Sequence, residues 1–228
     1  MASAMSDVRS ASGAEQADGP APPRRKRANG EQSRRRILGA AAEVASERGY
    51  EGTSIALVSA TCGLPASSIY WHFKDKDDLI AAVIESSFAS WLAAIELPGD
   101  QQAEPLRRGL TLAAQVAKAL LDSPDFLRLG LMLSLERRPE EPRARTMFLQ
   151  VRAVAAEQVA AVFRDLAPSL AESEIRLLTT YAIAGADGLF VAQQIGGPDG
   201  VDLPGLFALH AYAVHDTMTR LVAGSARR

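Results

Sequence analysis

Apolar residues recur along most of this chain at intervals of three and four positions, the spacing that gathers side chains on one face of an α-helix. The first segment with this spacing covers residues 33–48 and stops at Gly49. Its apolar members are Ile37, Ala40, Ala41, Val44 and Ala45. Segments that alternate apolar and polar residues are nearly absent, and aromatic residues make up only 6% of the chain. The pattern predicts an all-α protein.

Proline and glycine residues divide this pattern into nine expected helices, three in an N-terminal head and six in a C-terminal body. Thr53 or Ser54 can cap the second helix and Asp75 can cap the fourth. Pro65 can open the third helix, because its missing N–H costs little in a first turn. The ranges expected after the first helix are 54–61, 65–72, 76–97, 105–121, 124–136, 140–166, 171–195 and 203–223.

The two short helices of the head are joined by a turn at Gly63 and can pack on the first helix, which is the arrangement of a helix-turn-helix. We therefore expect a helix-turn-helix DNA-binding domain at residues 31–78 and a separate body at residues 79–228. Residues 1–30 are rich in Ala, Ser, Gly and Pro and lack apolar periodicity, so we expect a disordered N-terminal arm there.

Charge is distributed unevenly between these parts. The formal net charge of the chain is −2, but residues 24–76 contain ten Lys and Arg against five Asp and Glu, whereas residues 77–228 contain fourteen against nineteen. A basic head on an acidic body is suited to meeting a polyanion. The run Arg24-Arg25-Lys26-Arg27 lies in the expected arm and could follow phosphates or a minor groove, although it could also be a solvated charge run.

Other features narrow the class of protein. Cys62 is the single cysteine, which excludes an internal disulfide and fits a reducing cytoplasm. No apolar run reaches the roughly 18 to 20 residues of a membrane span, and no signal peptide begins the chain, so we expect a cytoplasmic protein without a membrane partner. His210 and His215 are five positions apart and do not share a helix face. With no phosphate-binding loop or nucleophile motif, we expect neither an enzyme nor a cofactor or metal.

The third helix carries the side chains that would enter the major groove of DNA. Its expected exposed positions are Ala66, Ser67, Ser68, Tyr70, Trp71 and His72. Hydroxyl, phenol and imidazole groups can donate hydrogen bonds to phosphate oxygens. Lys76, at the start of the next helix, adds an ammonium group beside free backbone N–H groups. The aromatic residues could instead pack between helices, and the histidine and lysine could simply face solvent.

The same region resembles a known family. The segments 52–55, 62–64 and 68–79, preceded by Arg48-Gly49-Tyr50, resemble the head of tetracycline-repressor-like (TetR) transcriptional regulators almost position by position. The resemblance is strong over residues 33–80, whereas the body matches only in the number and order of its helices. It implies an all-α regulator whose body binds a ligand and forms a dimer.

The resemblance also implies roles for single residues. Tyr70, His72 and Lys76 match phosphate contacts of the family. Ser54 matches a phosphate or capping contact at the first short helix, and Trp71 matches a Tyr-Trp-His variant found in the tetracycline repressor.

This chain departs from the family where longer polar side chains are common. Ala56 and Ala66 stand where many members place Arg, Lys or Gln, and Pro65 stands where Ser is common. Since alanine cannot make a bidentate contact with a base, base reading could rest on Ser67, Ser68, alanine contacts with thymine methyl groups, the basic arm and DNA shape.

The last two helices are expected to form the dimer interface. The resemblance implies that they pair with their copies, and two heads on a twofold axis would read more base pairs than one. The alternative is that these helices are buried within one protomer. Their apolar positions are Leu177, Leu178, Tyr181, Ile183, Ala184, Leu189, Phe190 and Ala192, then Leu206, Phe207, His210, Val214, Met218 and Leu221.

Helices between residues 88 and 190 could enclose an apolar pocket for a lipophilic ligand with one polar group. The candidate lining residues are Phe88, Trp91, Leu92, Phe126, Leu127, Leu131, Met132, Met147, Gln150, Val151, Val154 and Gln158. Gln158 lies on an apolar stripe and is the expected polar anchor. Taken singly, residues of this kind are more often ordinary core than ligand contacts, and we interpret Asp187 as structural or interfacial.

These observations predict a repressor that binds a pseudo-palindromic DNA operator as a homodimer and is released by a small lipophilic effector. The effector would move the long helix expected at 76–97 and so change the spacing of the heads. An activator that binds DNA in the same way is one alternative. The other is an all-α ligand carrier or enzyme whose head no longer reads DNA.

Overall fold

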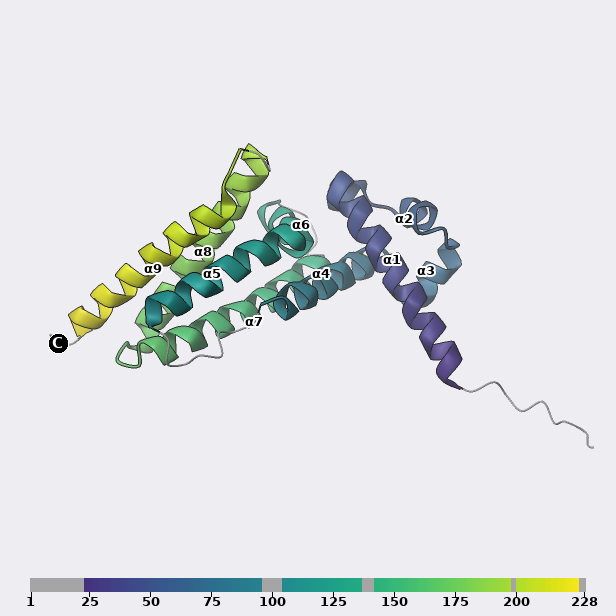
Figure 1. Ribbon diagram of the computed structural model, residues 1–228. Coiled ribbons are helices and arrows are strands. Elements are labelled where there is room, and N and C mark those ends of the chain that lie inside the picture. Colours follow the sequence, from purple (N-terminus) through teal and green to yellow (C-terminus); the bar gives the residue numbers. More distant parts are fainter. Residues whose placement is uncertain (1–22, 96–103, 137–141, 198–199, 226–228) are drawn as a thin grey trace, which may run out of the picture.

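A computed structural model of the protein describes residues 23–95, 104–136, 142–197 and 200–225, and within these ranges it contains nine α-helices and no strand (Figure 1). The all-α prediction is therefore confirmed. The helices are α1 (Pro23–Gly52), α2 (Ile55–Cys62), α3 (Ala66–His72), α4 (Lys76–Ala93), α5 (Pro105–Asp122), α6 (Asp125–Leu135), α7 (Arg143–Leu166), α8 (Glu172–Gly196) and α9 (Leu203–Ser225).

The local signals in the head act as the sequence predicts. Ser54, not Thr53, caps α2: its Oγ accepts a hydrogen bond from the Leu57 N–H at 3.3 Å. Gly63 ends α2 with a φ of +62°, the left-handed conformation that glycine adopts without strain. The Asp75 carboxylate caps α4 by accepting from the Asp78 N–H at 2.8 Å. These caps fix the directions in which α2, α3 and α4 leave their turns.

Helix α1 is longer than predicted at both ends. Its backbone is helical from Pro23, so the expectation of a disordered arm over 23–30 is wrong and the run 24–27 lies on a helix. Residues 1–22 of the expected arm lie outside the described residues. At the other end Gly49 adopts a φ of +70° and kinks the helix, which then continues to Gly52.

Head and body share one apolar core. Its buried members include Ile37 and Val58 of the head, Ile84 of α4, and Phe126 and Phe148 of the body. Figure 1 shows α4 running from α1–α3 toward the body helices. The predicted domain boundary between residues 78 and 79 falls inside the first turn of α4, so these residues form a continuous structure there.

Two side chains, Asp77 and Arg128, make hydrogen bonds across the junction between head and body. The Asp77 carboxylate of α4 accepts hydrogen bonds from the Tyr50 hydroxyl of α1 at 3.1 Å and from the backbone N–H groups of Arg143 and Ala144 at 2.7 and 3.1 Å. Arg143 and Ala144 open α7, so Asp77 satisfies two of the N–H groups that a helix start leaves without partners. Arg128 of α6 donates to Ser46 of α1 at 2.5 Å.

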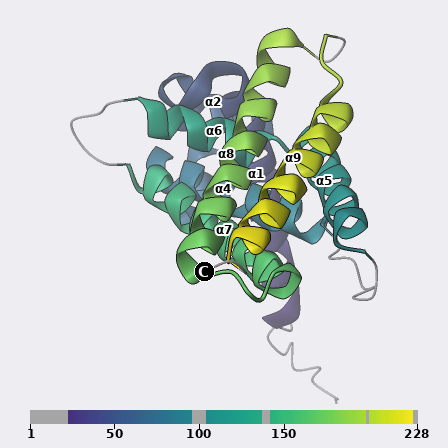
Figure 2. The same cartoon turned by 90° about the vertical axis from the view of Figure 1, so that its left-hand side faces the viewer.

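A second, smaller cluster fills the far end of the body. It contains residues from the end of α7, the start of α8 and the end of α9, with Phe163, Ile175, Leu178 and Met218 among its buried members. Figure 2 shows α8 and α9 side by side in front of the other body helices. The body therefore has apolar packing at both ends, in two separate clusters.

Gly130 of α6 provides a test of the packing in the first cluster. A Cβ added there would lie 1.9 Å from the Phe148 ring, whereas a Cβ at the exposed Gly39 of α1 meets nothing within 4 Å. We expect Gly130→Ala to lower the free energy of unfolding by about 1–3 kcal/mol through overpacking. Gly39→Ala should leave it unchanged or raise it by up to ~1 kcal/mol. Urea unfolding at one protein concentration measures both; equal stability of the two variants would contradict the close packing.

Candidate nucleic-acid interface and ligand cavity

Helix α3 presents one polar and aromatic face to solvent. Ile69 and Phe73 are buried against the head, whereas Tyr70 and Trp71 are 57% and 74% exposed. Ser67 is exposed too, and its spacing of three and four residues from the two aromatic residues places all three on one helix face. Two large aromatic side chains left in water on a seven-residue helix indicate a surface that contacts a partner.

The other predicted contacts on and beside α3 are less accessible. Ala66, Ser68 and His72 are half-buried, and Ser54 is engaged as the cap of α2. Burial and then the nearby Arg34 lower the pKa of His72, with Glu31 opposing them. His72 is therefore neutral near pH 7 and can offer a phosphate a single N–H instead of a charge.

Lys76 has partners inside the head that the sequence did not predict. Its ammonium group lies 3.2 Å from the backbone oxygen of Tyr50, 3.6 Å from the Glu51 carboxylate and 4.4 Å from the centre of the Tyr50 ring. These contacts tie the start of α4 to the end of α1. A phosphate would have to share this ammonium group with them.

Further cations of the head were not among the predicted contacts. Lys74 is exposed directly after α3, and Arg35 and Arg36 are exposed on α1. The Arg36 guanidinium reaches the Gly63 turn, and that of Arg34 lies 5.4 Å from the centre of the Phe73 ring. The run Arg34-Arg35-Arg36 could have indicated further DNA contacts from the sequence. Only the packing of α1 shows that these arginines lie beside the helix-turn-helix.

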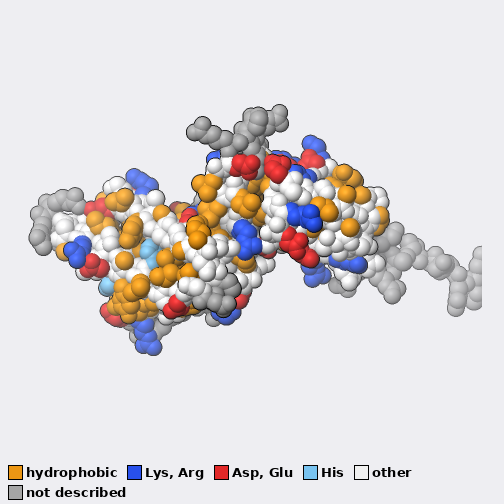
Figure 3. Space-filling view, turned by 90° about the horizontal axis from the view of Figure 1, so that it is seen from above, with side chains coloured by type: hydrophobic (Ala, Val, Ile, Leu, Met, Phe, Trp, Pro, Cys, Tyr) orange, Lys and Arg blue, Asp and Glu red, His pale blue; other side chains and the backbone are white. Residues whose placement is uncertain are grey.

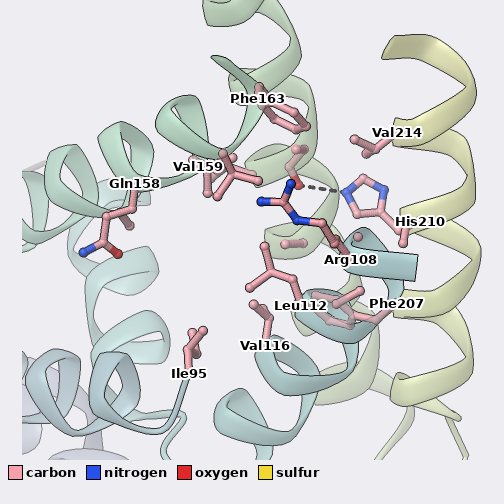
Figure 4. A pocket seen from close by; sticks show the side chains of 18 of the residues that line it. Ile95, Arg108, Leu112, Val116, Gln158, Val159, Phe163, Phe207, His210 and Val214 are labelled. Atoms are coloured by element: carbon pink, nitrogen blue, oxygen red, sulfur yellow. Dashed lines mark hydrogen bonds between the residues drawn. The ribbon is translucent and has the colours of Figure 1, made fainter. Parts of the chain in front are cut away.

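A cavity of about 700 Å³ lies between the two apolar clusters of the body. Trp91, Phe126 and Leu127 border it from the first cluster, and Phe163 and Met218 from the second. Its walls come from α5, α7, α8 and α9, from the end of α4 and from the start of α6 (Figure 4). A volume of this size, with mainly apolar walls, suits a small organic ligand.

The predicted lining residues separate into four groups. Trp91, Leu92, Phe126, Leu127 and Gln158 line the cavity. The remaining candidates do not: Phe88 and Val151 are buried in the first cluster, Leu131 and Met147 pack against it, and Met132, Gln150 and Val154 are exposed. Gln158, the expected polar anchor, is itself exposed, and Figure 4 shows it away from Arg108 and His210.

The sequence reading missed the walls formed by α5 and α9. Leu112 and Val116 of α5 and Phe207, His210 and Val214 of α9 line the cavity. Phe207 and Met218 are buried within the protomer, and so are Leu178 and Phe190 of α8. Much of this apolar stripe of α9 therefore faces α5 and the cavity within the protomer.

Charged side chains of the cavity wall are arranged in pairs. Arg108 of α5 donates to Asp165 of α7 at 2.7 Å. Arg152 of α7 binds both carboxylate oxygens of Asp187 of α8, one of them at 3.0 Å. Burial raises the pKa of Asp187 and the nearby Arg152 opposes this shift. Asp187, interpreted from sequence as structural or interfacial, therefore both joins two helices and faces the cavity.

His210 closes the wall between α8 and α9. Its Nε2 lies 2.8 Å from the backbone oxygen of Ala182, and its ring occupies the space beside Gly185 where a Cβ would fall 2.1 Å from the ring. Any larger residue at position 185 would push α9 away from α8. This histidine is thus a packing element of the cavity wall.

Helix α8 also carries an exposed apolar stripe that faces away from the cavity. The stripe repeats every three or four residues and consists of Leu177, Tyr181, Ala184, Gly188, Val191 and Ile195. Leu209 and Tyr212 are exposed on the adjacent α9. Figure 3 shows hydrophobic side chains gathered over the body half of the molecule. A continuous stripe of this kind indicates a face that another surface covers.

Of the described helices, α8 alone is long and apolar enough to cross a membrane, with a mean hydropathy of 1.3, which the sequence reading did not expect. Only 22% of that window is buried within the protomer. The helix carries the Arg152–Asp187 ion pair near its middle, which a lipid-facing helix would not favour. Its apolar character is therefore better explained by the cavity on one side and the exposed stripe on the other.

Comparison with known proteins gives matches that agree with this architecture. Residues 37–83 match the model of the family described as bacterial regulatory proteins, tetR family. The chain is 32% identical over 83 residues to the HTH-type transcriptional regulator AcrR of Shigella flexneri, covering 34% of this chain and 38% of that relative. The chain thus spans well under half of that protein.

Solved structures match over more of the chain. A regulator from Pseudomonas aeruginosa PAO1 superposes with a TM-score of 0.67 at 22% identity, over 87% of this chain and 94% of that one. The transcriptional regulator FadR from Bacillus subtilis superposes with a TM-score of 0.65 at 16% identity, over 78% and 96%. Residues 37–83 are thus a DNA-binding head of the TetR type, and the nine described helices share their fold with these regulators.

Proposed function

We propose that the protein is a transcriptional repressor that binds double-stranded DNA as a homodimer and releases it when a small lipophilic molecule enters the body. The observation that carries the DNA-binding part is the exposed face of α3 with Ser67, Tyr70 and Trp71. A helix with this face can enter the major groove, where hydroxyl and phenol groups donate to phosphate oxygens. A dimer bound over a promoter would exclude the transcription machinery by its bulk.

The exposed stripe of α8 supports dimerisation through the last two helices. Ala184 and Gly188 lie in the middle of the stripe and let a second helix approach closely, while Leu177 and Ile195 supply apolar contact toward its ends. A twofold axis through this stripe would present two α3 helices to one face of DNA. Half-sites about 34–36 Å apart then make the operator pseudo-palindromic.

The cavity supports response to an effector. Trp91 and Leu92 line it from the C-terminal end of α4. The N-terminal end of the same helix lies in the head. Helix α7 forms another wall, and its start is bound to Asp77 in the first turn of α4. A ligand that displaces either helix would therefore change the position of the head. The similar FadR structure from Bacillus subtilis is described in complex with stearoyl-CoA.

The first experiment is fluorescence anisotropy with DNA from upstream of the protein's own coding sequence, against an unrelated duplex, at several salt concentrations. A sequence-reading repressor binds the first duplex more tightly, and its affinity falls steeply with salt. If it binds neither the upstream DNA nor sites selected from random DNA, the head has lost its function and the carrier alternative holds.

Tyr70 tests the assignment of the DNA-contacting face. We expect Tyr70→Ala to weaken operator binding about 10- to 100-fold, because a hydrogen bond to a charged group contributes about 1.5–3 kcal/mol. Tyr70→Phe removes only the hydroxyl and should show most of this loss. Thr111→Ala, at an exposed position of α5 far along the chain from the head, is the control and should bind normally. Normal affinity of Tyr70→Ala, measured by anisotropy, would refute the assignment.

Gly188 tests the dimer interface without disturbing the protomer. A Cβ there meets nothing within 4 Å in the protomer, so the isolated protomer tolerates Glu. In the proposed dimer, Gly188→Glu buries a carboxylate near its own copy, and we expect the dimer dissociation constant to rise at least about tenfold. Sedimentation velocity measures this. Gly39→Glu, at an equally open position of α1, should remain dimeric. A fully dimeric Gly188→Glu variant would show that another face mediates assembly.

A further inference from the structure

The charge of the cavity wall limits which ligands it can hold. Among the described lining residues the ionised side chains are two arginines and two aspartates, and each arginine is paired with one aspartate. The lining therefore has no net formal charge when its histidines are neutral. The other described walls are mostly apolar, so they cannot neutralise a charge that a ligand brings in.

The Arg152–Asp187 pair is the deeper of the two. Both side chains are mostly buried, and the guanidinium uses two nitrogens to hold the two carboxylate oxygens. The pair joins two helices, because Arg152 lies on α7 and Asp187 on α8. An anionic ligand at Arg152 would have to sit beside the Asp187 carboxylate, which repels it.

The Arg108–Asp165 pair also joins one positive and one negative side chain, and it lies nearer the surface. Arg108 is mostly buried, and Figure 4 shows it beside His210 and Phe207, whereas Asp165 is largely exposed. A guanidinium carries five N–H groups, and Arg108 uses one nitrogen for Asp165. Donors therefore remain for an uncharged oxygen of a ligand, while the positive charge is already neutralised.

We propose that the cavity selects an uncharged lipophile with a hydroxyl or carbonyl oxygen over the carboxylate of the same carbon skeleton. An uncharged oxygen accepts a hydrogen bond from Arg108 or Arg152 without displacing either aspartate. A carboxylate adds an unneutralised negative charge to a low-dielectric site, which is unfavourable by desolvation and by repulsion from Asp187. This inference rests on the proposed ligand-binding function of the cavity.

The pairing also predicts how the preference can be inverted. Asp187→Asn keeps the size of the side chain but removes its charge, so Arg152 becomes an unpaired cation in the wall. The variant should therefore bind a carboxylate better than the native protein does. Adding Arg152→Met to the same chain removes both charges, restores a neutral wall and should restore the native preference.

The probes are 1-dodecanol and dodecanoate at pH 8, titrated below their aggregation concentrations. Binding is followed by tryptophan fluorescence, to which Trp91 on the wall contributes. We expect the native protein to bind the alcohol at least about tenfold more tightly than the carboxylate. Asp187→Asn should bind dodecanoate more tightly than dodecanol. The double variant should again bind dodecanol more tightly, as the native protein does. Circular dichroism melting establishes that each variant is folded.

Two results would overturn the proposal. One is tighter binding of dodecanoate than of dodecanol by the native protein; the other is an unchanged order in folded Asp187→Asn. If neither probe binds, the cavity is not a site for lipophiles, and both this inference and the effector part of the proposed function fail. DNA binding measured in parallel separates that outcome from a failure of the whole function.

Discussion

The structure depends on α4, which packs against the head at one end and against the body at the other within a single apolar core. Its early residues complete the packing of the head, and Phe88 and Trp91 pack with Phe126 near the cavity, with ring centres 5.2–5.7 Å apart. Because the apolar contact is continuous along the helix, the head cannot turn as a separate unit without repacking the body. Asp77 adds directional bonds to this contact by holding the start of α7. Two helices, α4 and α7, thereby connect the cavity wall to the head.

The body core, in contrast, is interrupted by the cavity. The cavity separates the first cluster from the cluster around Phe163 and Met218, so the far ends of α7, α8 and α9 are held mainly by each other. Empty apolar volume forfeits contacts that a filled core would have. A ligand that occupies the gap would join the two clusters and stabilise the arrangement of helices that fits it best. Under the proposed function, the same cavity would therefore allow a ligand to favour one conformation.

The two long C-terminal helices show how one sequence pattern serves two surfaces. Both are apolar on more than one side, which is typical of helices that are covered all round. Helix α9 turns Phe207 and Met218 inward, while α8 divides its apolar residues between Leu178 and Phe190, which face the protomer, and Leu177 and Tyr181, which face solvent. The outer face of α8 is therefore available for the predicted dimer interface. The inner stripe of α9 forms part of the cavity wall.

The sequence by itself determined the helices and the head. Caps and breakers such as Ser54, Gly63 and Asp75 act on their own neighbours, and so their effect is local and could be read along the chain. Periodicity likewise shows which residues share a helix face. It does not show which other helix meets that face, because that depends on packing between residues far apart in the chain. For this reason only the tertiary structure decided that Lys76 binds the end of α1, that α5 and α9 wall the cavity, and that Arg108 and Arg152 each meet an aspartate on another helix.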